Sequence, residues 1–300
     1  MISLSNAETF LSKFGLSLDR ITASVGEISP WETVLFGGSI PEGLANSQSD
    51  IDLLLLGDTE LIEPGASIPP IHAGDFRIGF QPNLGPLRLQ VETVPIGHLE
   101  VLARQMAEAA NSFIDPERAK RVLALGELDL RLLHRVCAGI PIKNPALAES
   151  WRARLRCGFL PSYMLASMIA QQSNLLEDAA GEAGEGRRES SLWMLKHALT
   201  YGAGALLASV EETNPNAKWR IRLLQVHREK VGAEIADALL QHLVATSFSS
   251  FDSYYAEAVR ICEEVTRVAL SRNAEVRTRR EKMLARSKQQ GILLPGLAAK

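Results

Sequence analysis

A glycine-rich turn followed by two acidic residues is the part of the chain best suited to chemistry. Gly37, Gly38 and Ser39 follow one apolar run, and Asp50 and Asp52 stand at the head of another. If the second run is a β-strand, both carboxylates point to the same face, about 7 Å apart along the backbone. Two like charges repel each other unless a cation lies between them. The pattern is typical of a magnesium site, because Mg²⁺ prefers carboxylate and phosphate oxygens.

Other phosphate-binding motifs do not fit the sequence. A Walker A loop needs Lys and then Ser or Thr after its last glycine. Gly38 and Gly43 have the required spacing, but Leu44 and Ala45 follow. The dinucleotide-binding pattern G-x-G-x-x-G is also absent from the sequence. Phosphate chemistry therefore rests on the glycine turn and the acidic pair.

The elements that must position these residues alternate between strand and helix patterns over the first hundred residues. Residues 57–74 are rich in proline and glycine, which predicts a long loop. Residues 51–56 are apolar almost throughout and predict a central strand covered on both faces. The remaining predictions are helices at 5–28 and 41–46 and strands at 33–36, 75–80 and 87–94.

From about residue 97 the strand patterns end and helical periodicity takes over. The segment 178–190 is rich in glycine and charge and predicts a surface loop. We therefore expect an α+β fold, with a small module in residues 1–112 and an α-helical domain in residues 113–300. Helices are predicted at 99–112, 116–138, 145–173, 191–211, 218–231, 233–245, 251–270 and 273–289.

Composition narrows the class of protein. The 300 residues carry a formal net charge of −3, so no basic field attracts an extended nucleic acid. Cys137, Cys157 and Cys262 are isolated, which predicts three buried reduced thiols rather than a disulfide or a zinc site. The first residues lack an apolar signal core, and no run is long enough to span a membrane. A cytoplasmic protein without a membrane partner is expected, and its oligomeric state stays open.

The order Gly-Gly-Ser, about ten residues, and then Asp-x-Asp in an apolar strand resembles the polymerase-β-like nucleotidyltransferase superfamily. Gly38-Ser39, Gly43 and Ser49-Asp50-Ile51-Asp52 are most similar to its small prokaryotic branch, the minimal and antibiotic-modifying (aminoglycoside-type) nucleotidyltransferases. The motif resemblance covers roughly residues 30–95. It implies a small mixed β-sheet module, and the helical second half is similar to that branch in architecture only.

The resemblance also implies a third carboxylate on a later strand. Glu92 is our candidate because it lies inside a strand, where an unpaired carboxylate is costly. Asp75 is the competitor, since it opens a strand, although it follows a glycine in a turn-like position. Asp50, Asp52 and Glu92 would then be the catalytic and metal-ligating residues for two Mg²⁺ ions.

The triphosphate of the donor needs further partners. We expect the backbone at Gly38 and the hydroxyl of Ser39 to contact the triphosphate. Ser49 is a further candidate for binding it. The helical half offers a cation, for which we favour Lys218, at the start of a helix. Lys196 and the arginines 220 and 222 remain alternatives, and a solvated helix start would explain Lys218 equally well.

The implied reaction is Mg²⁺-dependent transfer of a nucleoside monophosphate to a hydroxyl group of a small-molecule acceptor, with release of pyrophosphate. ATP is the expected donor. Three alternatives stay open: nucleotidylation of a protein or tRNA, synthesis of an oligonucleotide messenger, and a non-catalytic nucleotide-binding antitoxin. The acceptor and the base preference are not set by the sequence.

Each feature also has a purely structural interpretation. The two glycines can serve only a tight turn, and Ser39 can cap a helix. Asp50 and Asp52 can be solvated at a strand end, and Glu92 can pair with Arg88 on the same strand face. The functional interpretation rests on these residues occurring together and in this order.

Overall fold

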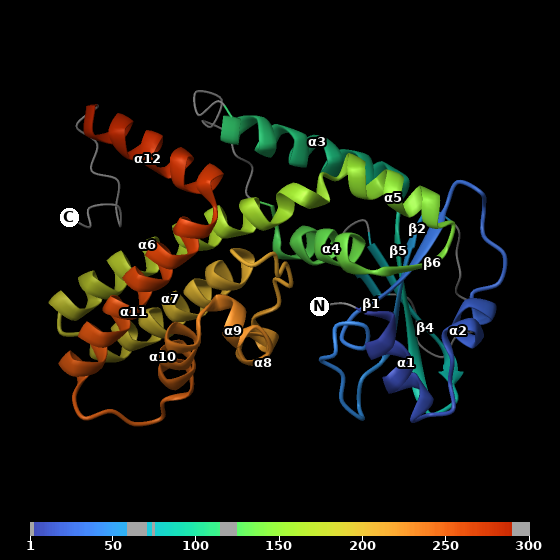
Figure 1. Cartoon of the computed structure of the whole chain (residues 1–300), viewed down its shortest axis with the longest axis horizontal. Helices are drawn as coiled ribbons and strands as arrows, with labels where there is room; N and C mark the ends of the chain where they lie inside the picture. The colour runs from blue at the N-terminus through green and yellow to red at the C-terminus, as the bar shows by residue number, and fades with distance from the viewer. Residues whose placement is uncertain (1–2, 59–70, 74–75, 115–124, 290–300) are drawn as a thin grey trace. The chain divides into compact units, whose positions relative to one another are not determined.

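The computed structural model describes residues 3–58, 71–73, 76–114 and 125–289 and divides into two compact units. The first unit contains the described parts of 1–108 and 123–158, and the second those of 109–122 and 159–300. Figure 1 follows the chain from the mixed α and β structure of the first unit to the helices of the second. The predicted α+β fold class is confirmed.

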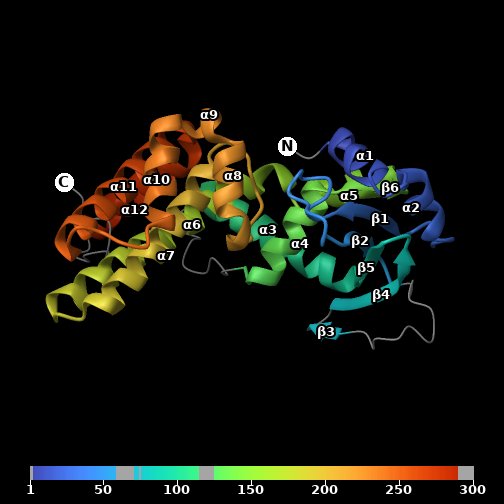
Figure 2. The ribbon, with the colours of Figure 1, turned by 90° about the horizontal axis from the view of Figure 1, so that it is seen from below.

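Within the described residues, a six-stranded mixed sheet forms the centre of the first unit (Figure 2). Its strand order is β3-β4-β5-β2-β1-β6; β2 and β5 run parallel, and the other neighbours are antiparallel. The predicted central strand is confirmed, because β2 lies inside the sheet and is almost wholly buried. The strands are β1 (Thr33–Gly37), β2 (Ile51–Leu56), β3 (Ile71–Ala73), β4 (Phe76–Leu84), β5 (Leu87–Val94) and β6 (Ile140–Lys143).

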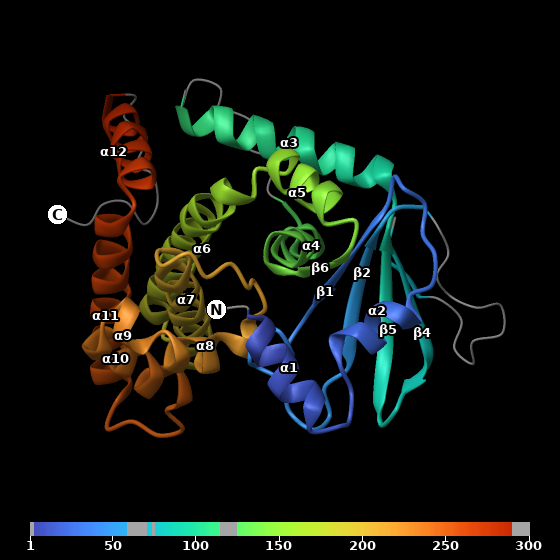
Figure 3. The ribbon, with the colours of Figure 1, turned by 45° about the vertical axis from the view of Figure 1, so that its right-hand side comes forward.

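The two faces of the sheet have different coverings. Ile51, Leu53 and Leu55 of β2 belong to one hydrophobic core with α1 (Leu4–Ser12) and α2 (Leu18–Ser24), which Figure 3 shows beside the strands. Side chains alternate along a strand, so the even-numbered residues of β2 and β5 face the opposite side. There α4 (Glu127–Ala138) and α5 (Pro145–Arg154) contact β1. The sheet thus separates an apolar face from the face that carries the acidic residues.

The N-terminal segment forms two helices instead of the single helix predicted at 5–28. The hydroxyls of Ser3 and Ser17 each accept a hydrogen bond from a backbone N–H three residues later, at 3.0 and 3.2 Å. These are N-caps, which begin a helix. Gly15 between them has a φ of 66°, which a helix cannot accommodate and which glycine adopts without strain.

Helix α4 is tied down at its C-terminal end. Arg152 of α5 donates to the backbone carbonyl of Val136 at 3.0 Å and to that of Gly139. A disulfide joins Cys137 to Cys157, with their Cα atoms 5.3 Å apart. The prediction of isolated thiols is therefore wrong for this pair, because sequence spacing does not show that the end of α4 meets the turn after α5. Cys262 is a buried free thiol, as predicted.

The described part of the second unit consists of helices. Long helices α6, α7 and α11 pack along one another, as Figure 3 shows, and the C-terminal end of α3 belongs to this unit. The remaining helices of the described residues are α3 (Ile96–Ile114), α6 (Leu160–Gly184), α7 (Arg188–Ala208), α8 (Arg220–Val226), α9 (Arg228–Val231), α10 (Ala233–Val244), α11 (Phe251–Arg272) and α12 (Ala274–Gln289). Two short 3-10 helices, η2 (Cys157–Phe159) and η3 (Ala217–Trp219), accompany them.

Three further predictions of local structure are wrong. The helix predicted at 145–173 is broken into α5 and α6, with Arg156 at a φ of 51° between them. The loop predicted at 178–190 is helical up to Gly184 and again from Arg188, because alanine and glutamate sustain the helix between the glycines. Strand β6 was not expected after residue 97; it adds to the sheet edge beside β1.

The division of the chain also differs from the expected boundary between residues 112 and 113. Helices α4 and α5 and strand β6 cluster with the first unit, because β6 pairs with β1 and both helices contact β1. The loop predicted at 57–74 is wrong at residues 71–73, which form strand β3, and residues 59–70 and 74 lie outside the described residues. Among the helices that the structure describes, none has the length and apolar character needed to cross a bilayer.

The disulfide predicts a redox-dependent stability. It closes a loop with a sequence separation of 20 residues, for which chain entropy gives about 3 kcal/mol. Urea unfolding with and without dithiothreitol should show a loss of this size in the wild type and in Cys262→Ala. Cys137→Ser should be less stable from the outset and should not respond to reductant. Three free thiols in unfolded, unreduced protein would contradict the assignment.

Candidate active site

The turn after β1 lies directly against Asp52. Gly37 is the register partner of Asp52 across the β1–β2 pair. Gly38 follows with a φ of 73°, and a Cβ atom placed there would come within 2.0 Å of Asp52 Oδ2. Glycine is thus required at position 38 for two reasons, its left-handed backbone and the space that the carboxylate occupies.

The chain from this turn to β2 is held by backbone and hydroxyl contacts. The Leu44 N–H donates to the Ser39 carbonyl at 2.9 Å. The segment predicted as a helix at 41–46 is therefore a turn, and Gly43 within it has a φ of 72°. The Ser49 hydroxyl accepts from the Asn46 N–H at 2.9 Å, and the Ser49 N–H donates to the Asn46 carbonyl at 3.0 Å. Ser49 thus closes the turn that leads the chain into β2.

Asp50 stands immediately before β2 and is paired with an arginine. Arg88 Nε and Nη2 donate to its two carboxylate oxygens at 2.9 and 2.7 Å. The register explains the pair, because Ile51 lies beside Leu89 in the parallel strands and Asp50 therefore falls beside Arg88. The hydrogen bond and charge of Asp50 raise the pKa of Arg88. Half of the Arg88 side chain is exposed, so this pair contributes little to stability.

Asp52 and Glu92 share one guanidinium group. Arg135 of α4 places Nη2 3.3 Å from Asp52 Oδ1 and donates from Nη1 to Glu92 Oε2. Glu92 lies on β5 beside Leu54, two positions along from Asp52 on the same face of the sheet. The side chains of Arg135, Asp52 and Glu92 are 22%, 17% and 15% exposed. Two carboxylates from adjacent parallel strands thus meet at a single cation in a half-buried position.

The charges around Arg135 favour its protonated form. Burial lowers the pKa of Arg135, but the charges of Glu92 and Asp52 outweigh it, and the pKa is raised overall. Glu42, in the turn after β1, contributes further negative charge. Its carboxylate is 3.2 Å from His134 Nε2, and both side chains are buried. Helix α4 therefore meets the acidic face with two adjacent residues, His134 and Arg135.

The predicted carboxylates offer the oxygen donors that Mg²⁺ prefers. Their present arrangement is that of three ion pairs: Asp50 is paired with Arg88, and Asp52 and Glu92 are each paired with Arg135. Among the described residues there is no group of three or more His, Cys, Asp or Glu side chains arranged to hold a metal ion. Donor chemistry thus fits a magnesium site, but a metal would have to replace the guanidinium of Arg135. Asp75, the competitor of Glu92, lies outside the described residues.

The predicted cation of the helical half belongs to the second unit. Lys218 lies in η3, exposed, with its Nζ 5.0 Å from the ring centroid of Trp219. Of the alternatives, Lys196 donates to the Ala245 carbonyl at 2.7 Å. Arg220 is buried and donates to two backbone carbonyls at 3.0 Å, and burial lowers its pKa to about 10. Each of these cations has a structural contact within its own unit.

Sequence reasoning missed Arg135, His134 and Glu42. The sequence contains one indication of Arg135 and His134. Leu132, Leu133 and Val136 form a buried stripe on α4, and a histidine and an arginine interrupt that stripe. Charged residues placed at core positions are rare unless they are paired, so this interruption indicates a buried acidic partner without saying which one.

No protein-family model matches the chain, and no curated protein matches its sequence. One solved structure similar to the chain is a nucleotidyltransferase-like protein from Exiguobacterium sibiricum 255-15. The match has 14% sequence identity and a TM-score of 0.42, and it covers 91% of this chain and 77% of the other.

A glycine comparison tests the close approach of Gly38 to Asp52. Gly26 has a φ of 70° and nothing within 4 Å of an added Cβ, so Gly26→Ala meets only backbone strain, about 1–2 kcal/mol. Gly38→Ala meets the same strain and must also displace the Asp52 carboxylate. Chemical denaturation should show a larger loss for Gly38→Ala than for Gly26→Ala. Equal losses would show that the turn and Asp52 are not in contact.

Removing the shared cation should destabilise the first unit. Arg135→Met removes the cation that lies between two half-buried carboxylates and balances their charge, at a cost of about 2–4 kcal/mol after allowing for solvent. Arg131→Met is the matched control, because Arg131 is exposed on the same helix. Denaturation midpoints at low salt should separate the two variants clearly. A midpoint for Arg135→Met equal to that of the control would contradict the bridging role.

Proposed function

We propose that the protein is a Mg²⁺-dependent nucleotidyltransferase that transfers a nucleoside monophosphate, with ATP as the expected donor, to a hydroxyl group of a small-molecule acceptor. One observation carries the proposal: Asp52 and Glu92 meet at a single cation beside the glycine turn. A pair of carboxylates that already shares one cation is suited to hold another of higher charge. The Gly-Gly-Ser turn at the same place supplies backbone and hydroxyl donors for phosphate oxygens.

The roles proposed for the individual residues are those that the resemblance implies. Asp50, Asp52 and Glu92 would hold two Mg²⁺ ions, which when bound neutralise the triphosphate. Glu92 would accept the proton of the acceptor hydroxyl. The hydroxyl oxygen then forms its bond to the α-phosphorus while the bond to pyrophosphate breaks. Gly38 allows the backbone to approach the phosphates closely, and Ser39 donates a hydrogen bond to them.

Arg135 would change partners during binding. Its guanidinium neutralises Asp52 and Glu92 when no metal is present. With Asp52 and Glu92 holding Mg²⁺, the donor fork of Arg135 would be available to phosphate oxygens, which it matches in geometry. Arg135 would thereby supply the cation for which the sequence suggested Lys218. Arg88 would release Asp50 at a lower cost, because that pair is more exposed.

A second candidate function is nucleotide binding without catalysis. The observation that favours it is the pairing of all three predicted metal ligands with arginines.

Nucleotidylation of a protein or a tRNA and synthesis of an oligonucleotide messenger would use the same site with another acceptor. They differ from the main proposal only in the product.

The experiment compares Asp52→Asn with Asp19→Asn. The first variant removes a proposed metal ligand and keeps the side-chain shape; the second removes an exposed charge in the first turn of α2. Wild-type protein with Mg²⁺, each of the four nucleoside triphosphates and a panel of small hydroxyl compounds should release pyrophosphate. Asp52→Asn should lose at least a thousandfold in rate, because electrostatic and metal contacts dominate such chemistry, and Asp19→Asn should lose nothing.

Binding measurements complete the test. Calorimetry of wild-type protein with ATP should show affinity that requires Mg²⁺ and that Asp52→Asn loses. Mg²⁺-dependent binding without pyrophosphate release under any of these conditions would favour the non-catalytic candidate. Wild-type turnover in folded Asp52→Asn would show that Asp52 is not a metal ligand.

A further inference from the structure

A second site, independent of the proposed function, lies within the helical unit. A cavity of about 230 Å³ lies among α6, α11 and α12. Its walls are mainly apolar, with Ile169, Leu270 and Met283 among the lining residues. Arg279 and Arg280 of α12 also line it. The volume is roughly that of eight water molecules, which limits an occupant to a small molecule.

One buried nitrogen of each arginine lacks a hydrogen-bond acceptor. Arg279 Nε and Arg280 Nη1 are buried and have no hydrogen-bond partner among the described residues. The Arg279 guanidinium carbon lies 4.1 Å from the ring centroid of Phe113, which holds the group in place without accepting a hydrogen bond. Burial lowers the pKa of both arginines. Burying a charged nitrogen without an acceptor is costly, so an anion in the cavity that accepts from both nitrogens would lower the free energy of the folded unit.

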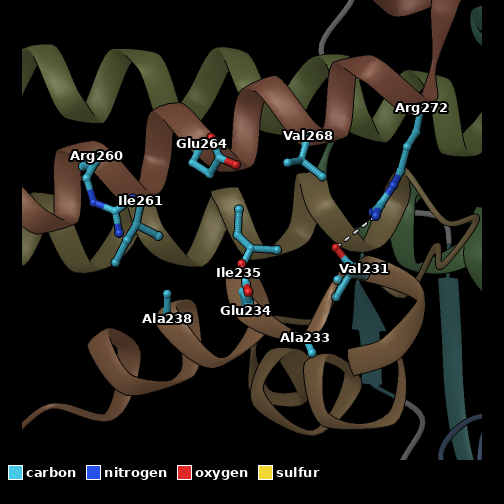
Figure 4. A pocket seen from close by; sticks show the side chains of 11 residues that line it. Val231, Ala233, Glu234, Ile235, Ala238, Arg260, Ile261, Glu264, Val268 and Arg272 are labelled. Atoms are coloured by element: carbon cyan, nitrogen blue, oxygen red, sulfur yellow. Dashed lines mark hydrogen bonds between the residues drawn. The ribbon is translucent and has the colours of Figure 1, made fainter.

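A second cavity of the helical unit shows the contrast. It measures about 480 Å³ and lies between α10 and α11 (Figure 4). Its arginines already have acceptors: Arg272 donates to the Val231 carbonyl at 3.1 Å, and Arg260 donates to Glu257 at 3.0 and 2.7 Å. These two arginines therefore do not need an anion as a further acceptor. Among the described arginines that line these two cavities, Arg279 and Arg280 are the ones with a buried nitrogen that lacks an acceptor.

We propose that the cavity lined by Arg279 and Arg280 binds a small organic anion, with its carboxylate or phosphate at the two guanidinium groups and a short apolar group against Ile169, Leu270 and Met283. The planar donor forks of arginine match carboxylate and phosphate oxygens alike. The apolar walls select for an organic body and disfavour a bare inorganic ion. The site lies wholly in the second unit and uses no residue of the candidate active site.

Calorimetry on the full chain tests the site with four probes: hexanoate, phenyl phosphate, inorganic phosphate and hexanol. Hexanoate or phenyl phosphate should bind at least tenfold more tightly than inorganic phosphate, which lacks the apolar group, and than hexanol, which lacks the charge. Preference between the two organic anions identifies the head group. Failure of both to bind overturns the proposal, as does hexanol binding as tightly as hexanoate.

Variants on one helix locate the binding. Arg280→Gln and Arg279→Gln should each weaken the better organic anion at least tenfold, and Arg280→Lys, which keeps a point charge but loses the fork, should weaken it less. Arg277→Gln is the matched control, because it removes the same charge from an exposed position on α12. An equal loss in Arg277→Gln would show only general attraction to a basic helix and would overturn the site. If a glutamine variant does not fold, Arg280→Lys against Arg277→Lys decides in the same way.

Discussion

The guanidinium of Arg135 between Asp52 and Glu92 is the interaction on which the candidate site depends. Two carboxylates on adjacent strands and the same sheet face repel each other, and a half-buried position weakens the screening by water. Arg135 offsets part of that repulsion. It can do so only because α4 lies against β1, where Arg152 and the disulfide hold its C-terminal end. The geometry of the acidic face is thus set by contacts outside the motif itself.

The same interaction relates the resting structure to the proposed chemistry. A single charge on Arg135 balances two carboxylates only in part, and a divalent ion would balance them more fully. A guanidinium that leaves the carboxylates would have a new partner at hand, since its shape also matches phosphate. The close contact between Gly38 and Asp52 keeps the phosphate-sized turn and the carboxylates together during such an exchange. Binding of metal and nucleotide would therefore be coupled through one side chain.

The sequence predicted the parts of the fold that repeat with a local period. The continuous apolar run of β2 and the alternation in β5 are local signals, and the structure has both strands. Period-two alternation also placed Glu92 on the polar face of its strand, where it meets Arg135. Strand β6 and the disulfide were missed, because both depend on which segments meet in space. The break near Arg156 and the helical ends of α6 and α7 were missed because glycine and charge content does not decide where a helix stops.

In the candidate site, too, the sequence predicted what depends on local patterns and missed what depends on which segments meet in space. Gly38, Asp50 and Asp52 follow from residue types and spacing. The arginine partner of Asp50 comes from a neighbouring strand, and that of Asp52 from a helix residue 83 positions away in sequence. Lys218 was favoured as a cation at a helix start, yet its contact is with its neighbour Trp219 in the second unit. Charge balance over long sequence separations is not readable from one chain, because any of many arginines satisfies the demand. The roles of the three carboxylates as metal ligands stay predictions.

A crystal structure with Mg²⁺ and a non-hydrolysable ATP analogue tests the central claim most directly. The account predicts metal on Asp52 and Glu92, and the Arg135 guanidinium moved from these carboxylates to phosphate oxygens beside the Gly38 turn. A nucleotide bound elsewhere, with Arg135 still bridging Asp52 and Glu92 at saturating Mg²⁺, would contradict it.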